Sequence, residues 1–261
     1  MKPAEHQKFV GAVQAAVKIM RRLAEVDQAE GVASIARATG LNVSTTFNIL
    51  KTLTKERLVT FDDRTKAYDL GLGVLDIAMP VMGRPPAELI RPLMEEIAER
   101  HQTSVALWHV TDARRVVMSD HVAPSRVVHA VLRPGARFPD LAGAVGRCVA
   151  AHREYDRDTL EREFAALRWQ NPPSFDTYWA EVQQARQDGY AIEVGQLFRG
   201  ITLIASVACD AQGAPRLGLS AVSIAQQIED DRLADVARDL STAVQAIERG
   251  VFGVTGGSRR D

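Results

Sequence analysis

The feature that most restricts the fold of this chain is a change of hydrophobic period at about residue 57. Residues 43–55 place apolar side chains at every third or fourth position, which predicts a helix. Residues 59–70 instead alternate around a polar turn, which predicts a two-stranded hairpin. Two further helical patterns, at 9–27 and 32–40, come before them. Three helices followed by a hairpin within about 70 residues are typical of a winged helix-turn-helix.

The third predicted helix has clear start signals. Gly40 and Leu41 supply the bend and the core contact expected between two helices, and Asn42 is a favourable N-cap. The spacing predicts a buried face made of Val43, Phe47, Leu50 and Leu53. In the first helix the apolar side chains at helical spacing are Val10, Val13, Val17, Met20 and Leu23.

The small polar side chains at the start of the third helix indicate contact with DNA. In a helix-turn-helix this helix enters the major groove by its N-terminal end, where the helix dipole favours phosphate. Asn48 is the best candidate for reading a base, because an amide can form a bidentate pair with adenine worth ~1–3 kcal/mol. The alternative for each residue is a solvated surface or simple capping. The predicted DNA-binding residues are Ser44, Thr45, Asn48, Lys51 and Lys55 on the helix, with Arg64 and Lys66 at the hairpin tip.

The remaining sequence predicts a second, larger domain. Residues 71–82 form an apolar connector, and the two prolines of "GRPPAE" indicate a boundary. An amphipathic helix at 87–101 follows, then strand-like runs at 104–110, 115–122, 127–132, 190–194, 202–208 and 216–222, interrupted by helical segments and closed by a helix at about 229–249. This order predicts an α+β fold with an antiparallel sheet. The predicted divisions are 1–70, a linker helix at 71–86, 87–253, and a disordered tail at 254–261.

Composition narrows the functional classes. The net charge is −1, but residues 1–70 carry more Lys and Arg than Asp and Glu, which favours a polyanion partner for that part. Cys148 and Cys209 lie in apolar runs and are predicted to be buried free thiols. Because the start lacks a signal-type apolar core and no run of 18 apolar residues exists, we predict a soluble cytoplasmic protein without a membrane partner.

Other chemistry has little support in the sequence. The chain has no G-x-S-x-G, H-E-x-x-H, G-x-G-x-x-G or P-loop motif, so we predict no catalytic residues and no cofactor. His109, His121 and His129 match no recognised ligand spacing, so no metal site is predicted. A hydrolase and a ligand-independent structural DNA-binding protein remain as alternatives. A turnover screen would test the first, and a ligand-induced shift in melting temperature would test the second.

Five segments, taken in order, resemble the IclR family of bacterial transcription regulators. "AVQAAVKIMRRLAE" is similar to the first helix of that family, and "SIARATGLNVSTTFNILKTLTKERLV" to its helix-turn-helix. "YDLG" resembles its wing exit and "ARFPDLAGAVGRCVAAH" its effector-domain segment. "DGYAIEVGQLFRGITLIASVACDAQGAPRLGLSAV" is similar to the region of its two late strands. The family commonly has arginine where Asn48 stands, so a different operator sequence is expected.

The resemblance implies a winged-helix domain, a linker helix and a GAF/PAS-like α/β effector domain. It also implies a ligand-responsive regulator, repressor or activator, that binds a pseudo-palindromic double-stranded operator as a homodimer or homotetramer and senses a small organic acid or related metabolite. Carried over from the family, the effector-binding residues would be Val127, Ala130, Ala144, Val145, Glu193, Ile201, Leu203, Ser220 and Val222.

Two observations from the residues themselves bear on that pocket. The small residues of 142–146 leave room and expose backbone N–H groups near a helix start, which suits a carboxylate, although they also suit close packing of a helix on a sheet. His129 lies close to the carried-over positions and could bind a ligand carboxylate or hydroxyl. Trp108, Trp169 and Trp179 are predicted to be packing residues, with ligand stacking by one of them as the alternative.

Overall fold

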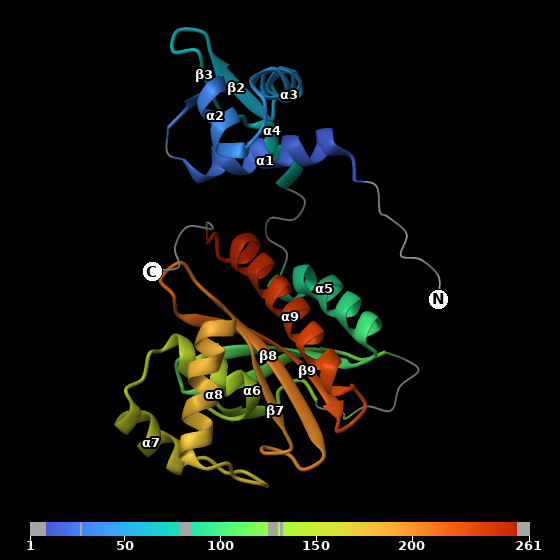
Figure 1. Cartoon of the computed structure of the whole chain (residues 1–261), viewed down its shortest axis with the longest axis vertical. Helices are drawn as coiled ribbons and strands as arrows, with labels where there is room; N and C mark the ends of the chain where they lie inside the picture. The colour runs from blue at the N-terminus through green and yellow to red at the C-terminus, as the bar shows by residue number, and fades with distance from the viewer. Residues whose placement is uncertain (1–8, 27, 79–84, 125–129, 131–132, 255–261) are drawn as a thin grey trace. The chain divides into compact units, whose positions relative to one another are not determined.

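The computed structural model describes residues 9–26, 28–78, 85–124, 130 and 133–254. The chain divides into two compact units, Met1–Arg84 and Pro85–Asp261, which we call the N-terminal and C-terminal units (Figure 1). The division falls within the segment 71–86 that the sequence predicts as a linker.

The N-terminal unit is a winged helix-turn-helix. Its elements are α1 (Gly11–Glu25), β1 (Glu30–Gly31), α2 (Val32–Thr39), α3 (Val43–Lys55), β2 (Val59–Asp62), β3 (Ala67–Leu70) and α4 (Gly73–Ala78). The three strands form an antiparallel sheet in the order β1-β3-β2, and the wing hairpin pairs Val59 with Leu70 and Asp62 with Ala67. Between α2 and α3 Gly40 has φ 69°, and Asn42 caps α3 by accepting a 2.7 Å hydrogen bond from the N–H of Thr45.

The packed face of α1 is offset from the apolar series seen in the sequence. The buried side chains are Ala15, Ile19 and Leu23, which follow one another at four-residue spacing. Val13 and Val17 are 60% and 41% exposed, so of the series seen in the sequence these two face outward, whereas Leu23 is buried. Because a surface helix buries one stripe, the fit of Ile19 into the core decides which face is inside.

The prediction for α3 was wrong at two positions. Val43 and Phe47 are exposed, whereas Thr46, Leu50 and Leu53 are buried. Thr46 was the missed member. It can replace an apolar residue because its hydroxyl donates a 2.9 Å hydrogen bond to the carbonyl of Asn42.

The wing is joined tightly to the end of α3. The N–H groups of Gly71 and Gly73 donate to the carbonyls of Leu58 and Arg57, at 2.9 and 3.0 Å. A Cβ atom on Gly71 would lie 2.3 Å from the Arg57 carbonyl oxygen, so no side chain fits there. The glycines of "YDLGLG" are therefore required by the close approach of two backbones.

The C-terminal unit is built on one six-stranded sheet. Its helices are α5 (Pro86–His101), α6 (Gly143–His152), α7 (Arg157–Ala165), α8 (Phe175–Asp188) and α9 (Asp230–Val251). Its strands are β4 (Ser104–Thr111), β5 (Arg115–Val122), β6 (Arg137–Pro139), β7 (Ala191–Val194), β8 (Ile201–Cys209) and β9 (Pro215–Ile224). Every pairing is antiparallel, in the order β6-β5-β4-β9-β8-β7. The predicted α+β class with an antiparallel sheet is confirmed.

Helices cover both faces of this sheet (Figure 1). Alternation along β4 shows the arrangement: Val105 and Leu107 belong to the core with α5 and α9, while Ala106 and Trp108 belong to the core with α6 and α8. The unit is therefore a three-layer α/β/α structure.

The strand predictions between β5 and α6 have two different outcomes. The predicted strand at 127–132 lies, except for residue 130, outside the described residues. Strand β6, at Arg137–Pro139, was not predicted, because three residues with a proline carry too little alternating pattern.

Candidate DNA-binding surface and effector pocket

The exposed surface of α3 consists of two parallel rows. Residues four apart in a helix lie above one another on the same face, and every member of these rows is exposed. The first row, which we call the mixed row, contains Val43, Phe47, Lys51 and Lys55, and the second contains Ser44, Asn48 and Thr52. The mixed row is thus apolar near the N-terminus of α3 and cationic near its C-terminus.

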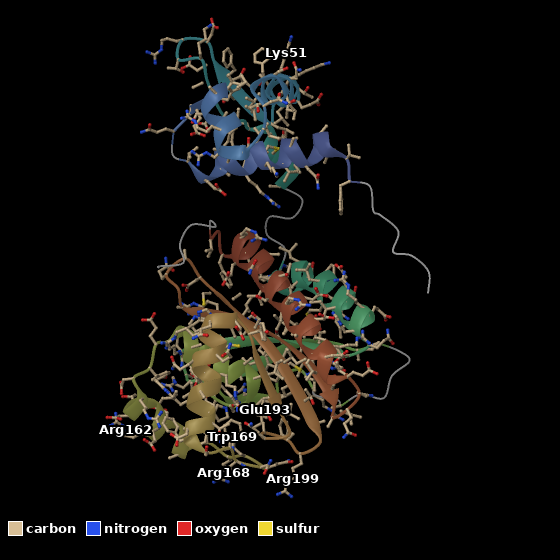
Figure 2. The ribbon with its side chains drawn as sticks, in the orientation of Figure 1. Lys51, Arg162, Arg168, Trp169, Glu193 and Arg199 are labelled. Atoms are coloured by element: carbon tan, nitrogen blue, oxygen red, sulfur yellow. The ribbon has the colours of Figure 1, made fainter. Side chains whose placement is uncertain are left out.

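The structure places most of the predicted DNA-binding residues of α3 in these rows. Ser44, Asn48, Lys51 and Lys55 are exposed, and Figure 2 shows Lys51 at the outer edge of the unit. Thr45 is half-buried, and its N–H is already used by the cap. Because α3 carries no acidic residue, its free surface is positive. Val43 and Phe47 are the surface residues that the sequence pattern assigned to the core.

The two cationic residues of the wing tip, Arg64 and Lys66, differ in their side-chain partners. Asp62 accepts hydrogen bonds from the N–H of Arg64 and the hydroxyl of Thr65, both at 2.8 Å, and these bonds lower the pKa of the Asp62 carboxyl. Lys66 pairs with Asp63, and its Nζ lies 5.8 Å from the centre of the Phe61 ring. The Arg64 side chain is exposed and makes no ion pair within the described part of the chain. Arg64 therefore has no ion pair to break before it could bind an external anion, whereas Lys66 is paired with Asp63.

A pocket lies in the C-terminal unit between the start of α6 and the sheet. It encloses a cavity of about 30 Å³, which is enough for at least one water-sized group. The rings of Trp108 and Phe138 meet edge to face at 5.7 Å, and Phe138 meets Phe198 at the same distance. The lining residues are Trp108, Val116, Phe138, Ala142, Gly143, Ala144, Val145, Leu197, Phe198, Leu203 and Ser220.

Four predicted effector residues, Ala144, Val145, Leu203 and Ser220, line this cavity. Ala130, Glu193, Ile201 and Val222 do not line it; Ala130, Ile201 and Val222 belong to or pack against the same core cluster, and Glu193 lies next to the lining residues Gly143 and Leu197. Val127 and His129 lie outside the described residues. Phe138 and Phe198 were not identified as site residues from the sequence, and ligand stacking by Trp108 was only the alternative to a packing role; a tryptophan in the middle of a predicted strand was the one available signal.

Two polar groups face the pocket region. Ser220 Oγ accepts a 2.8 Å hydrogen bond from Trp108 Nε1, which leaves its own hydroxyl proton to donate. No side chain caps the start of α6. Gly143 occupies that start with φ 67°, and a Cβ atom there would lie 3.0 Å from Leu197 and 4.0 Å from Glu193 Oε2. The positive φ and the closeness of Leu197 favour glycine at this position, and the Glu193 carboxyl lies nearby.

Glu193, on β7, is a buried and half-satisfied carboxyl (Figure 2). Its side chain is 1% exposed, and Oε1 accepts from the N–H groups of Gln196 and Leu197. Oε2 is buried without a hydrogen-bond partner in the described part of the chain. Burial raises the pKa of Glu193, and the two N–H bonds and Arg147 only partly oppose this shift. The raised pKa makes the neutral acid, which can donate from Oε2, easier to form than in an exposed glutamate.

Arg147, on α6, contacts the carbonyl of Gly143 at the start of the same helix. It was not identified as a functional residue from the sequence. Its side chain is fully buried, with Nε 2.7 Å from Glu181 Oε2 and Nη1 2.9 Å from the carbonyl of Gly143. Its guanidinium also lies over the rings of Trp169 and Tyr178, at 5.5 and 4.9 Å. Arg147 thus fixes the start of α6 to α8.

Among the residues that the structure describes, no group of three or more His, Cys, Asp and Glu side chains is placed to hold a metal ion. His109 is exposed on β4, and His129 is not described. No helix in the described ranges has the length and apolar character needed to cross a bilayer.

Known proteins match both units. Residues 12–63 match the IclR helix-turn-helix domain, and residues 84–249 match the IclR C-terminal domain of bacterial transcriptional regulators. The chain is 23% identical over 249 residues to the HTH-type transcriptional repressor AllR of Escherichia coli K12, covering 91% of this chain and 92% of the relative. It is 26% identical over 254 residues to the glycerol operon regulatory protein of Streptomyces coelicolor, covering 96% and 98%.

Solved structures agree in fold. A transcriptional regulator from Rhodococcus sp. RHA1 superposes with a TM-score of 0.65 at 21% identity, covering 95% of this chain and all of that one. The repressor BlcR of Agobacterium tumefaciens gives 0.62 at 19% identity, covering 92% and 96%. With two family domains matched in order over most of its length, the chain belongs to the IclR family of bacterial transcriptional regulators.

Proposed function

We propose that this regulator binds a pseudo-palindromic operator as a homo-oligomer and changes its DNA affinity when a small organic acid binds in the C-terminal unit. The observation that carries the proposal is the unpartnered, buried Oε2 of Glu193 beside the uncapped start of α6. A buried polar atom without a partner costs free energy, so a ligand that supplies one is favoured there.

The chemistry of the pocket favours a short acid. The amides at the start of α6 and the hydroxyl of Ser220 can donate to a carboxylate. The raised pKa of Glu193 eases its protonation, and once protonated it does not repel that carboxylate and can donate to it or to a neighbouring oxygen. The aromatic walls would hold the remaining apolar body of the ligand.

Surface charge near the pocket supports an anionic ligand. Arg199 directly follows the pocket residue Phe198, and the N–H of Arg199 donates a 2.9 Å hydrogen bond to Gln170 Oε1. Arg168 and Arg199 are both exposed, and Figure 2 shows them at the outer edge of the unit. Cations beside a pocket raise the local concentration of an anion.

The exposed apolar residues of the N-terminal unit support association with a second copy. On α1 and just before it, Phe9, Val10, Val13 and Val17 are between 41% and 71% exposed. Leu72, Leu75 and Ile77, in and beside α4, are between 50% and 78% exposed. Apolar residues gathered in this way are typical of an interface, and a second copy would bring two α3 helices to two half-sites. The segment 71–86 would then couple ligand binding to their spacing, with a coupling free energy of ~1–3 kcal/mol.

The decisive experiment measures binding of the full chain to its own promoter region and to scrambled DNA at moderate salt. A panel of small carboxylic acids is included, with the matching alcohols as controls. We expect a preference for the promoter region, a changed affinity with one acid, and a raised melting temperature with the same acid. No preference for any DNA would contradict operator binding, and no effect of any acid would contradict the proposed ligand class.

A further inference from the structure

The mixed row of α3 begins with two apolar side chains that phosphate contacts do not use. Phe47 is 48% exposed and Val43 is 52% exposed. Neither belongs to the hydrophobic core of the N-terminal unit, and Phe47 makes no ring contact with another described residue. Nothing in the packing of the unit therefore requires an aromatic side chain at position 47.

The neighbours of Phe47 place it within the expected DNA contact. Asn48 follows it in sequence and lies in the adjacent row, and Lys51 lies one turn further along the mixed row. The uncompensated positive charge of Lys51 and Lys55 complements a polyanion. A protein surface covering Phe47 would have to bury or neutralise these lysines as well, so duplex DNA is the occupant that the charges favour.

The major groove offers one apolar group that suits such a side chain. Its base edges present hydrogen-bond donors and acceptors, except for the C5-methyl group of thymine. We propose that Phe47, supported by Val43, packs on the methyl group of a thymine next to the base pair that Asn48 reads. This inference depends on the proposed operator binding, and it adds that each half-site contains an obligatory thymine beside the base pair read by Asn48.

Replacing thymine by deoxyuridine tests the proposal, because it removes the methyl group and leaves the hydrogen-bonding groups of the base unchanged. An operator duplex is first selected from random DNA with the full-length protein. Each thymine is then replaced singly, and binding is measured by fluorescence anisotropy. We expect one position in each half-site where the replacement weakens binding about four-fold, the factor that corresponds to burying one methyl group.

The variant Phe47→Ala should bind the thymine and deoxyuridine duplexes equally at that position. Asn48→Ala serves as the matched control: it should relax the preference at the neighbouring base pair and keep the deoxyuridine effect. Circular dichroism and solution mass of both variants are compared with wild type, and we expect no change, since both side chains are exposed.

The possible failures are distinct. If the wild type selects no sequence, operator binding itself is wrong. If it selects a sequence but tolerates deoxyuridine at every position, operator binding stands and the thymine contact is wrong. If Phe47→Ala changes the solution mass, the residue belongs to an interface between copies, and the proposal is also overturned.

Discussion

Arg147 and Glu181 form an ion pair in which Nη2 lies 2.6 Å from Oε2, and the arginine side chain has no solvent exposure at all. A close counterpart exists at the surface of the same unit. Arg157 pairs with Asp176 and lies over two aromatic rings, Phe175 and Trp179, but it is 45% exposed. Both arginines make an ion pair and lie over two rings, but Arg147 is buried and also donates to the Gly143 carbonyl and to Gln196.

This difference predicts unequal costs for removing the two side chains. Arg147→Ala should lower the free energy of unfolding by ~3–5 kcal/mol, because it leaves a cavity and breaks a buried pair. Arg157→Ala should lower the free energy of unfolding by less than ~1 kcal/mol, because water can solvate the exposed Asp176 carboxylate that remains. Urea unfolding of both variants measures this, and equal losses would show that burial does not set the strength of these contacts.

Glu193 predicts a dependence of stability on pH. Because its folded pKa is raised, the folded state holds the proton in a pH range where the unfolded state has released it. Wild type should therefore lose stability relative to Glu193→Gln as pH rises from about 4.3 through the folded pKa, and the difference should then stay constant. Melting temperatures across pH measure this. The exposed variant Glu161→Gln is the control, and a Glu193→Gln difference that grows as pH falls would contradict the prediction.

Filling the cavity should remove the ligand response. Ala144 lines the cavity and is 1% exposed, so Ala144→Trp should abolish the effect of the acid while DNA binding remains. Ala144→Val adds less volume and should weaken the response with less strain. Exposed Ala165→Trp on α7 is the matched control for a large side chain. A full response in Ala144→Trp would place the ligand elsewhere.

The wing exit should tolerate no side chain. Gly71→Ala places a Cβ atom against the Arg57 carbonyl oxygen and should cost ~1–3 kcal/mol, with a loss of operator affinity. Gly11→Ala, which has no atom within 4 Å of the new Cβ, should change stability by less than ~0.5 kcal/mol. Thermal unfolding and DNA titration compare the two, and an unaffected Gly71→Ala would show that the wing can move away from α3.

Salt dependence should identify the phosphate contacts. Lys51→Ala should weaken binding to all sequences and reduce the slope of log affinity against log salt by ~1. Arg64→Ala should act similarly, and Lys66→Ala less, because Lys66 is already paired with Asp63. Exposed Arg168→Ala in the C-terminal unit is the control and should leave the slope unchanged. An unchanged slope in Lys51→Ala would exclude this lysine from phosphate binding.

The sequence predicted local features better than the choice between similar faces. Asn42 was correctly predicted as a cap, because capping depends on a few neighbouring residues. In α3, however, either Phe47 or Thr46 could join Leu50 and Leu53 on the buried face. The hydrogen bond of the Thr46 hydroxyl favours burial of Thr46, and Phe47 is left exposed. A hydrophobicity pattern does not reveal this hydrogen bond, because it counts Thr46 as a polar residue.

The pocket was harder to predict because it depends on strand order. Trp108, Phe138 and Phe198 are far apart in sequence: Trp108 and Phe138 come from β4 and β6, on either side of β5, and Phe198 comes from the segment between β8 and β7, the strand at the other edge of the sheet. The small residues of 142–146 did indicate the correct helix start. The full burial of Arg147 had no local signal, since it requires both Glu181 and the rings of α8 and the preceding loop.

Strand β4 holds the pocket wall Trp108 on one side and, through Val105 and Leu107, the helix α5 on the other. Along the chain, α5 is the first helix after the junction between the two units. A ligand that displaces Trp108 therefore strains β4, the strand against which α5 packs. Because the interior is closely packed, empty space cannot absorb this displacement. The sheet can therefore transmit it from the pocket to α5.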